Sequence, residues 1–292
     1  PTPNLDGGGA AGPILKPVPA MPTENDRAIK LGHPSYVWGF GQERRFKLLA
    51  EAAGPLAGAR VLDIGCGIGA FLGRFQKVTP AVFGVEVDRE RAVLAGRVVP
   101  AVVQGVGECL PFKAEVFDLA LLHEVLEHVD DDRQVLAEAW RVLRPGGRLV
   151  IFVPNRLWPF ETHGIFWGGR YRFGNYPFVN YLPDPLRNRL APHVRVYTRG
   201  RLRRLLAGLP GRVVVHRGVF PGFDKLAGRS RLLAGLLRLF LHALERTPAH
   251  RFGLSHFVVL VKDPADFPKT SPTHPETWAG GANGPAATSH IF

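Results

Sequence analysis

The chain has 292 residues, 46% of them hydrophobic, and carries 37 lysines and arginines against 25 acidic residues, a formal net charge of +12. This length suits one sizeable globular domain with an insertion, or one domain with a small second unit. Two cysteines, Cys66 and Cys109, exclude a disulfide framework, and no apolar run reaches the roughly 18 to 20 residues of a membrane span. We therefore expect a cytoplasmic protein.

The net positive charge indicates an anionic binding partner: phosphorylated or carboxylated substrates, nucleic acid or an acidic membrane surface. A compositional bias toward arginine explains it equally well. The sequence has no RGG run and no dense Lys/Arg block. We therefore do not expect nucleic acid as a partner, and the sequence does not indicate an oligomeric state.

The two ends of the chain differ from its middle. Residues 1–25 and 264–292 are rich in proline, glycine and small residues and lack hydrophobic periodicity, which predicts disordered tails. Met21 is the only methionine, so the natural start could lie there. The expected globular domain is 26–263.

Short apolar runs alternate with segments of helical length along the first half of this domain. The runs lie at 59–65, 81–87, 100–105, 117–122 and 147–154. Such alternation predicts a parallel sheet with helices on both faces. The helix before the last run is the clearest: an aspartate at 130–132 can cap its start, and the Pro145-Gly146-Gly147 sequence ends it.

After Val153 the pattern changes. Residues 154–196 are rich in proline, glycine and aromatic residues, which predicts an inserted cap whose aromatic side chains shape an acceptor pocket. A helix should begin after Thr198, and strands are expected at 212–220 and 254–262. The amphipathic segment 229–246 between them either packs on the core or lies on a membrane beside a lipid-linked acceptor.

The glycine-rich sequence VLDIGCGIGAFL at 61–72 is the strongest local signal. A strand should end near Asp63, and a turn with Gly65 and Gly67 should lead into a helix whose start favours an anion. Glu86 closes the next strand, where a carboxylate can accept both hydroxyls of a ribose. The GxGxxA spacing also fits a dinucleotide, but Asp63 would repel a pyrophosphate and attract an ammonium or sulfonium group.

The stretch HEVLEHV, residues 123–129, looks at first like a zinc motif. His123 and His128 are five residues apart, which separates them by about 140° around a helix. A helical zinc pair is four residues apart. We therefore predict no metal site.

Together these motifs make the chain resemble the class I S-adenosylmethionine-dependent methyltransferases, of the small-molecule type related to the ubiquinone-pathway enzymes. The resemblance rests on DIGCGIG, GVEVD, GECLPFKAEVFDL, EVLEHV and LRPGGRLV, and runs from about 35 to 155. It implies an α/β, Rossmann-like doubly wound sheet of seven strands with an antiparallel last strand. The cap would follow strand 5, and the extra helix would separate the last two strands.

The resemblance also implies roles for individual residues. The methionine end of S-adenosyl-L-methionine would lie on Asp63, Gly65 and Gly67, the ribose on Glu86, and the adenine on Val87, Gly107 and Glu108, with Leu122 and His123 closing the site near the sulfonium. The family usually has an acidic residue where this chain has Val106. Losing that hydrogen bond would cost on the order of 0.5–1.5 kcal/mol, which does not abolish cofactor binding.

Methyl transfer to an oxygen or nitrogen can require a base. The candidates are His123, Glu124, His128 and, in the cap, His163 or Glu161, of which His123 and His163 are taken as catalytic. His128 is expected to be structural. The predicted function is methyl transfer to a small-molecule, sugar or lipid-intermediate acceptor at oxygen. The alternatives are an NAD(P)-dependent oxidoreductase or epimerase, suggested by GxGxxA, and a non-catalytic module that keeps the cofactor fold.

Overall fold

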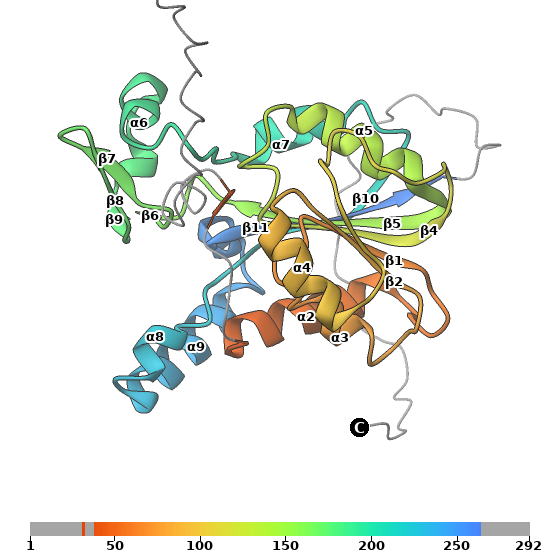
Figure 1. Ribbon diagram of the computed structural model, residues 1–292. Helices are drawn as coiled ribbons and strands as arrows, with labels where there is room; N and C mark the ends of the chain where they lie inside the picture. The colour runs from red at the N-terminus through yellow and green to blue at the C-terminus, as the bar shows by residue number, and fades with distance from the viewer. Residues whose placement is uncertain (1–30, 33–37, 264–292) are drawn as a thin grey trace, which may run out of the picture.

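The computed structural model describes residues 31–32 and 38–263. The two predicted tails lie outside these residues. The described chain forms one layered α/β unit with two additions, a cap and a pair of helices (Figure 1).

A seven-stranded sheet forms the centre of the molecule. Its strands are β1 (Val61–Ile64), β2 (Val82–Glu86), β3 (Val102–Gln104), β4 (Phe117–His123), β5 (Leu143–Pro154), β10 (Gly211–Val219) and β11 (Ser255–Lys262). Their order is β10-β11-β5-β4-β1-β2-β3, and β11 runs antiparallel to both of its neighbours, β5 and β10. The strands from β3 to β5 are parallel. The predicted fold class and its antiparallel last strand are confirmed.

Helices cover both faces of the sheet, as Figure 1 shows. One layer contains α5 (Asp132–Val142) and α7 (Arg199–Leu206); the other contains α2 (Phe40–Ala53), α3 (Leu72–Phe75) and α4 (Arg89–Val98). The alternation of side chains along β4 feeds two cores, with Leu119 and Leu121 in one and Ala120 and Leu122 in the other. Because both faces are covered, the strands are apolar throughout, which is why they appeared as continuous runs in the sequence.

Side-chain caps fix where several helices begin. Asp88 accepts a hydrogen bond from Arg91 N at the start of α4, and Asp131 accepts two at the start of α5. Thr198 caps α7 in the same way. Each cap satisfies a backbone N–H that has no partner inside its own helix.

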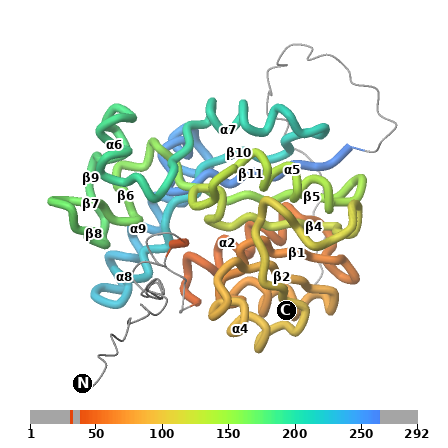
Figure 2. Tube along the Cα trace, turned by 45° about the horizontal axis from the view of Figure 1, so that its top comes forward, coloured from red at the N-terminus to blue at the C-terminus, as the bar shows by residue number. Residues whose placement is uncertain are grey.

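The cap follows β5, as predicted. It consists of β6 (Phe160–Glu161), β7 (Ile165–Trp167), β8 (Arg170–Arg172), β9 (Tyr176–Pro177), the 3-10 turn η1 (Val179–Tyr181) and α6 (Asp184–Leu190). Strand β6 pairs with β9, and β7 pairs with β8, both antiparallel. A buried ion pair between Arg187 and Glu161, at 2.8 Å, ties α6 to β6. The cap therefore carries its own buried polar centre, beside the sheet rather than on it (Figure 2).

The second addition lies between β10 and β11, where the sequence predicted an extra helix. It comprises α8 (Asp224–Ala227), α9 (Arg231–Leu244) and the 3-10 turn η2 (Pro248–Phe252). Helices α8 and α9 stand apart from the sheet, next to the start of α2 (Figure 1). Within the described residues, no helix has the length and apolar character needed to cross a bilayer.

Candidate active site

A cavity of about 660 Å³ opens at the carboxyl ends of the parallel strands. Its walls come from β1, β2 and β4 with the loops that follow them, from the start of α2 and from the segment before α8. Ligands of open α/β sheets bind at this edge because the carboxyl ends of the strands and their loops meet there. Nearly all of the residues predicted for the cofactor line this one cavity: Asp63, Gly65, Gly67, Glu86, Val87, Gly107, Glu108 and His123.

The glycine turn forms the floor of the cavity. Gly65 and Gly67 both have positive φ, 73° and 56°, a conformation that side chains with a Cβ rarely adopt. A Cβ on Gly65 would lie 2.6 Å from Val125, so this glycine permits close packing. A Cβ on Gly67 would meet no atom within 4 Å and would project into open space. Gly67 therefore leaves room for a ligand against the backbone.

Two carboxylates flank this turn. Glu86 accepts hydrogen bonds from the backbone of Gly67 at 2.8 Å and of Asp88 at 3.0 Å, which fixes the carboxylate at the end of β2. Asp63 is buried at the end of β1. Burial, and next the charge of Glu86, raise the pKa of Asp63 to about 8. A cation placed between these two acids would be stabilised, whereas a pyrophosphate would meet negative charge.

The helix after the turn is shorter than the sequence suggested. The turn at 65–71 leads into α3, which covers Leu72–Phe75. A helix of one turn offers little dipole, so the expected anion site at its start is not supported. The carboxylates and the glycine backbone, rather than a helix end, determine the chemistry of this floor.

The loop after β3 completes the nucleoside end of the cavity. Gly107 and Glu108 line it, and so does Val106, which takes the place of the acidic residue usual in the resembling family. Leu122 does not line it: its side chain is fully buried in the core beneath α5. That part of the prediction is corrected, because alternation along β4 turns Leu122 away from the cavity.

His123, at the end of β4, is held as a neutral imidazole. Its Nε2 lies 3.0 Å from Nη1 of Arg45, which can only donate. Burial, and next the charge of Arg45, lower the pKa of His123 to about 3. The ring also packs against Phe71 and Phe152. An imidazole that is already accepting a hydrogen bond from a guanidinium is a poor base, so His123 is suited to closing the site rather than to taking a proton.

Arg45 links three segments behind His123. It donates to Glu124 at 2.7 Å and to Ser255 at 2.7 Å. Burial alone would raise the pKa of Glu124, but the charge of Arg45, the two neighbouring histidines and the hydrogen bond from Arg45 together outweigh burial and hold that pKa well below its usual range. Glu124 has a positive φ of 56°, a strained conformation for a residue with a Cβ. The ion pair fixes this bend immediately beyond β4.

His163 reaches the same cavity from the cap. Its Nδ1 lies 3.0 Å from Glu161, whose other oxygen accepts from Arg187 at 2.8 Å. A carboxylate at Nδ1 fixes the tautomer and leaves Nε2 as the proton acceptor of the imidazole. His163 lines the cavity together with His128. Of the two predicted histidines, His163, held by Glu161, is therefore the better placed to act as a base.

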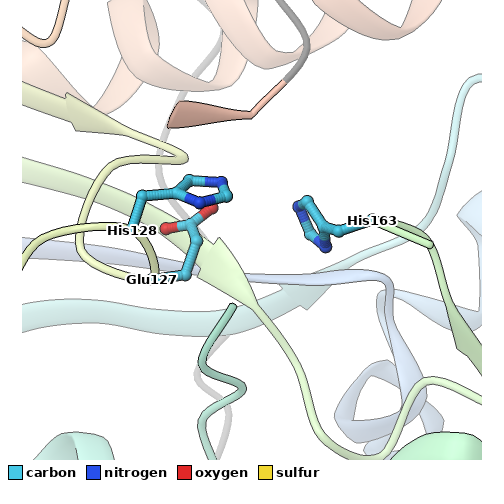
Figure 3. A group of neighbouring side chains, drawn as sticks. All are labelled: Glu127, His128 and His163. Atoms are coloured by element: carbon cyan, nitrogen blue, oxygen red, sulfur yellow. The ribbon is translucent and has the colours of Figure 1, made fainter. Parts of the chain in front are cut away.

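His163 also meets two residues of the 123–129 stretch. Glu127, His128 and His163 each place one ligand atom so that these atoms lie within 4.8 Å of one another, and Figure 3 shows the group. Among the described residues, neither oxygen of Glu127 nor Nδ1 of His128 has a hydrogen-bond partner. Burial, and next the charge of Glu124, raise the pKa of Glu127 well above its usual range.

Carboxylate and imidazole groups in this arrangement could hold a divalent cation. The sequence-based expectation of no metal considered only His123 with His128. The third member of this group comes from the cap, 35 residues after His128, and sequence spacing gave no signal for it.

Other expectations about the walls of the cavity fail. The predicted aromatic residues of the cap do not line it; His163 is the cap residue that does, and Trp167 is 59% exposed. The reason is that β7 and β8 pair with each other, in a hairpin that lies beside the sheet. Three residues that sequence reasoning missed do line the cavity: Arg45, Arg91 and Asp224.

Arg91 shows why the sequence did not predict these residues as part of the cavity wall. It extends from α4 and donates to the backbone oxygens of Leu31 and Gly32, which holds that segment on the rim of the cavity. In the sequence, Arg91 and Arg45 are ordinary charged residues of helical stretches. A signal for them exists only once the helices are packed.

Known proteins share the two main features of this fold. One is the strand order, with an antiparallel strand between β5 and β10, and the other is the glycine turn after β1. Residues 62–151 match the family described as "Methyltransferase domain". Residues 62–151 therefore carry a methyltransferase domain, and the sheet around them has the class I fold. The family and the fold of this domain imply S-adenosyl-L-methionine as its cofactor, and the methyltransferase interpretation displaces the oxidoreductase alternative.

The similarity to individual proteins supports the same conclusion. A crystal structure of an S-adenosylmethionine-dependent methyltransferase from Mesorhizobium loti aligns over 77% of this chain and 99% of its own, with a TM-score of 0.53 and 16% identity, and establishes the fold alone. An uncharacterized 37.1 kDa protein in a transposon of Streptomyces fradiae is 40% identical over 116 residues, 37% of this chain and 34% of that protein.

A ubiquinone biosynthesis O-methyltransferase from Parvibaculum lavamentivorans is 33% identical over 140 residues, 45% of this chain and 54% of that protein. The chain therefore spans about a third to about half of the length of these two relatives.

Proposed function

We propose that the chain methylates a hydroxyl oxygen of a small-molecule, sugar or lipid-intermediate acceptor, with S-adenosyl-L-methionine as the methyl donor. The observation that carries this proposal is the single cavity that joins the carboxylate pair Asp63 and Glu86 to the dyad Glu161 and His163. One end suits a cationic nucleoside, and the other end offers a proton acceptor.

The residues at the first end fit the cofactor. Glu86 can accept from ribose hydroxyls, Asp63 can face the ammonium or sulfonium charge, and the open space above Gly67 admits the ligand. The cofactor supplies an activated methyl group when it is bound. The contribution of this chain is to hold the acceptor oxygen in line with that group, which can lower the barrier by roughly 7–11 kcal/mol.

The residues at the other end fit an acceptor hydroxyl. Nε2 of His163 would take the proton from the acceptor oxygen, and Glu161 would stabilise the resulting imidazolium. A base of this kind is worth about 10²–10⁴-fold in rate. The name of the Parvibaculum relative, an O-methyltransferase, supports oxygen as the methylated atom.

The test uses S-adenosylmethionine labelled in its methyl group, incubated with the full chain and a metabolite extract, followed by mass spectrometry of what gained the label. The expected product carries the label on an ether or ester oxygen. The His163→Asn variant should lose most of the turnover while keeping affinity for S-adenosylhomocysteine. The matched control is His216→Ala, which removes a histidine of β10 outside the cavity.

Two results would overturn the proposal. Tight binding of S-adenosylhomocysteine with no labelled product from any extract would favour the non-catalytic module. Turnover that disappears on chelation and returns with a divalent cation would move the proton-accepting role from His163 to a cation at Glu127, His128 and His163.

A further inference from the structure

Helix α9 is inverted with respect to an ordinary surface helix. Its polar side chains face the protein: Arg238 donates to the backbone oxygen of Gly222 at 2.6 Å and lies 4.1 Å from the ring centroid of Phe40. His242 stacks on the same ring. A surface helix normally buries its apolar stripe and exposes its charges.

Glu245, immediately after α9, completes this inner polar face. It accepts a hydrogen bond from Phe220 N at 2.8 Å and forms an ion pair with Arg44 of α2. On a helical wheel, Arg238, His242 and Glu245 lie within about 60° of one another. These polar contacts attach α9 to the segment before α8 and to α2, and they leave its leucines without a core to enter.

The outer face of α9 is apolar. Leu232 is 75% exposed and Leu239 is 73% exposed, with Leu236 between them on the same stripe. Leu233 and Phe240 flank the stripe and are exposed as well. We call these five side chains the α9 apolar face. A contiguous exposed patch of this kind marks an interaction surface.

We infer that the α9 apolar face docks on a phospholipid bilayer that contains anionic headgroups. The charges around the face select this partner. Arg229 and Arg231 stand exposed at the start of the helix, and Arg246 stands exposed just after its end. An amphipathic helix with apolar side chains below and basic side chains at its margins binds in the plane of such a surface.

A second copy of the chain fits this surface less well. If two such helices packed face to face, the basic end of one helix would lie beside a basic end of the other, in either relative direction. Like charges oppose that contact. The helix is also small: 14 residues cover about 21 Å by about 10 Å, roughly 200 Å², against about 800 Å² per partner in a standard interface.

Docking through α9 would hold the rim of the cavity about one helix diameter, roughly 10 Å, from the lipid surface. Pro221, Gly222 and Asp224, which line the cavity, belong to the segment that leads into α8 and α9. His242 and Arg238 bond the backbone oxygens of Pro221 and Gly222, so the inner face of α9 is fastened to the cavity rim. Resting on the proposed methyl transfer, the inference narrows the acceptor to an amphiphilic or lipid-linked molecule that enters from the bilayer.

The test is sedimentation of the full chain with vesicles. Vesicles of phosphatidylcholine with an equal part of phosphatidylglycerol should bind the chain, and vesicles of phosphatidylcholine alone should bind it at least about tenfold more weakly. The variant Leu232→Glu/Leu236→Glu/Leu239→Glu should lose binding at least about tenfold. Its melting temperature and its affinity for S-adenosylhomocysteine should not change, because the three side chains are exposed.

A charge-matched control separates apolar contact from simple charge. Val78→Glu/Val93→Glu/Val214→Glu adds the same three charges at exposed valines away from α9 and should keep vesicle binding within about threefold. A Phe240→Trp variant should shift its emission to the blue when anionic vesicles are added, which reports entry of position 240 into the apolar boundary.

The outcomes are distinct. Equal vesicle binding by the leucine triple variant and its control would overturn the inference. A dimer in analytical ultracentrifugation that the leucine variant dissolves, with no vesicle binding by the unmodified chain, would also overturn it in favour of a second copy. Vesicle binding without methyl transfer would instead leave the docking in place and reject the proposed function.

Discussion

Arg45 Nη1 lies 3.0 Å from Nε2 of His123, and this contact divides the roles of the two predicted histidines. The guanidinium can only donate, so the imidazole nitrogen that faces it is already accepting a hydrogen bond. His163, by contrast, directs Nδ1 to a carboxylate. On this geometry we propose that proton transfer falls to the cap histidine.

The first prediction compares these two histidines. His163→Asn should lower kcat by about 10²–10⁴-fold, because the base is lost while the cavity wall is kept. His123→Asn should lower kcat by less than about tenfold and act mainly on KM. Initial rates with the acceptor identified by label transfer measure both. A larger loss of kcat for His123→Asn would contradict the assignment.

The second prediction concerns the orientation of His163. Glu161→Gln should lower kcat, because the neutral amide no longer stabilises the imidazolium that forms when His163 takes the proton. It should also lower the melting temperature, since Arg187 would be left as a buried unpaired charge. A double variant, Glu161→Gln/Arg187→Met, removes that charge. If Glu161 only stabilised the cap, the double variant would recover both stability and the original kcat.

The third prediction uses a matched pair of glycines. Gly67 and Gly58 both have positive φ, and a Cβ on either would meet nothing within 4 Å. Gly67→Ala should weaken binding of S-adenosylhomocysteine by about ten- to a hundredfold, because its methyl group would occupy ligand space. Gly58→Ala should lower only the folding stability, by about 1 kcal/mol, because a residue with a Cβ is strained at positive φ. Calorimetric titration with S-adenosylhomocysteine measures the affinity of both variants. Similar affinities for the two variants would show that the ligand binds elsewhere.

The fourth prediction follows from the raised pKa of Asp63, about 8 in the folded chain. At pH 7 the carboxyl is protonated, and a bound ammonium or sulfonium favours the ionised form, so cofactor binding should release a proton. Binding enthalpies in phosphate and in Tris buffer should therefore differ for the unmodified chain but agree for Asp63→Asn. Equal enthalpies for the unmodified chain would contradict the role of Asp63.

The same group makes stability depend on pH. Since the folded pKa lies above the usual 3.8, the folded chain binds more protons between about pH 4 and 8, and its unfolding free energy falls as pH rises through that window. Asp63→Asn should remove this loss and stabilise the cofactor-free chain at pH 8 by up to about 5 kcal/mol. That corresponds to a rise of about 2–4 °C in melting temperature per kcal/mol.

The fifth prediction concerns the group of Glu127, His128 and His163. Millimolar Mn²⁺ or Zn²⁺ should raise the melting temperature of the unmodified chain, since a ligand that binds the folded state stabilises it, and should inhibit methyl transfer, since a cation on His163 occupies the proton acceptor. The rise should vanish in Glu127→Gln and persist in Glu51→Gln, which alters an exposed carboxylate of α2. Affinity for S-adenosylhomocysteine should be the same with and without chelator. An equal rise in both variants would reject this site.

The sequence by itself determined the sheet and the cofactor end of the cavity. Strands appeared as apolar runs because both of their faces are covered, and the carboxyl ends of parallel strands meet at one edge. Asp63, Gly67 and Glu86 each follow or close such a strand, so their order along the chain was enough to bring them together. Leu122 was misplaced because its role was carried over from the family resemblance, which did not take account of the alternation of side chains within β4.

Only the tertiary structure decided the acceptor end and the outward face of α9. His163 reaches His128 because the cap folds on its own hairpins and ion pair, and Arg45 reaches His123 because α2 packs on one face of the sheet against β5. The periodicity of α9 revealed two faces but not which one points inward. The direction in which α9 faces depended on residues outside the helix: the backbone groups of Phe220 and Gly222, which accept or donate hydrogen bonds, and the ring of Phe40, on which His242 stacks.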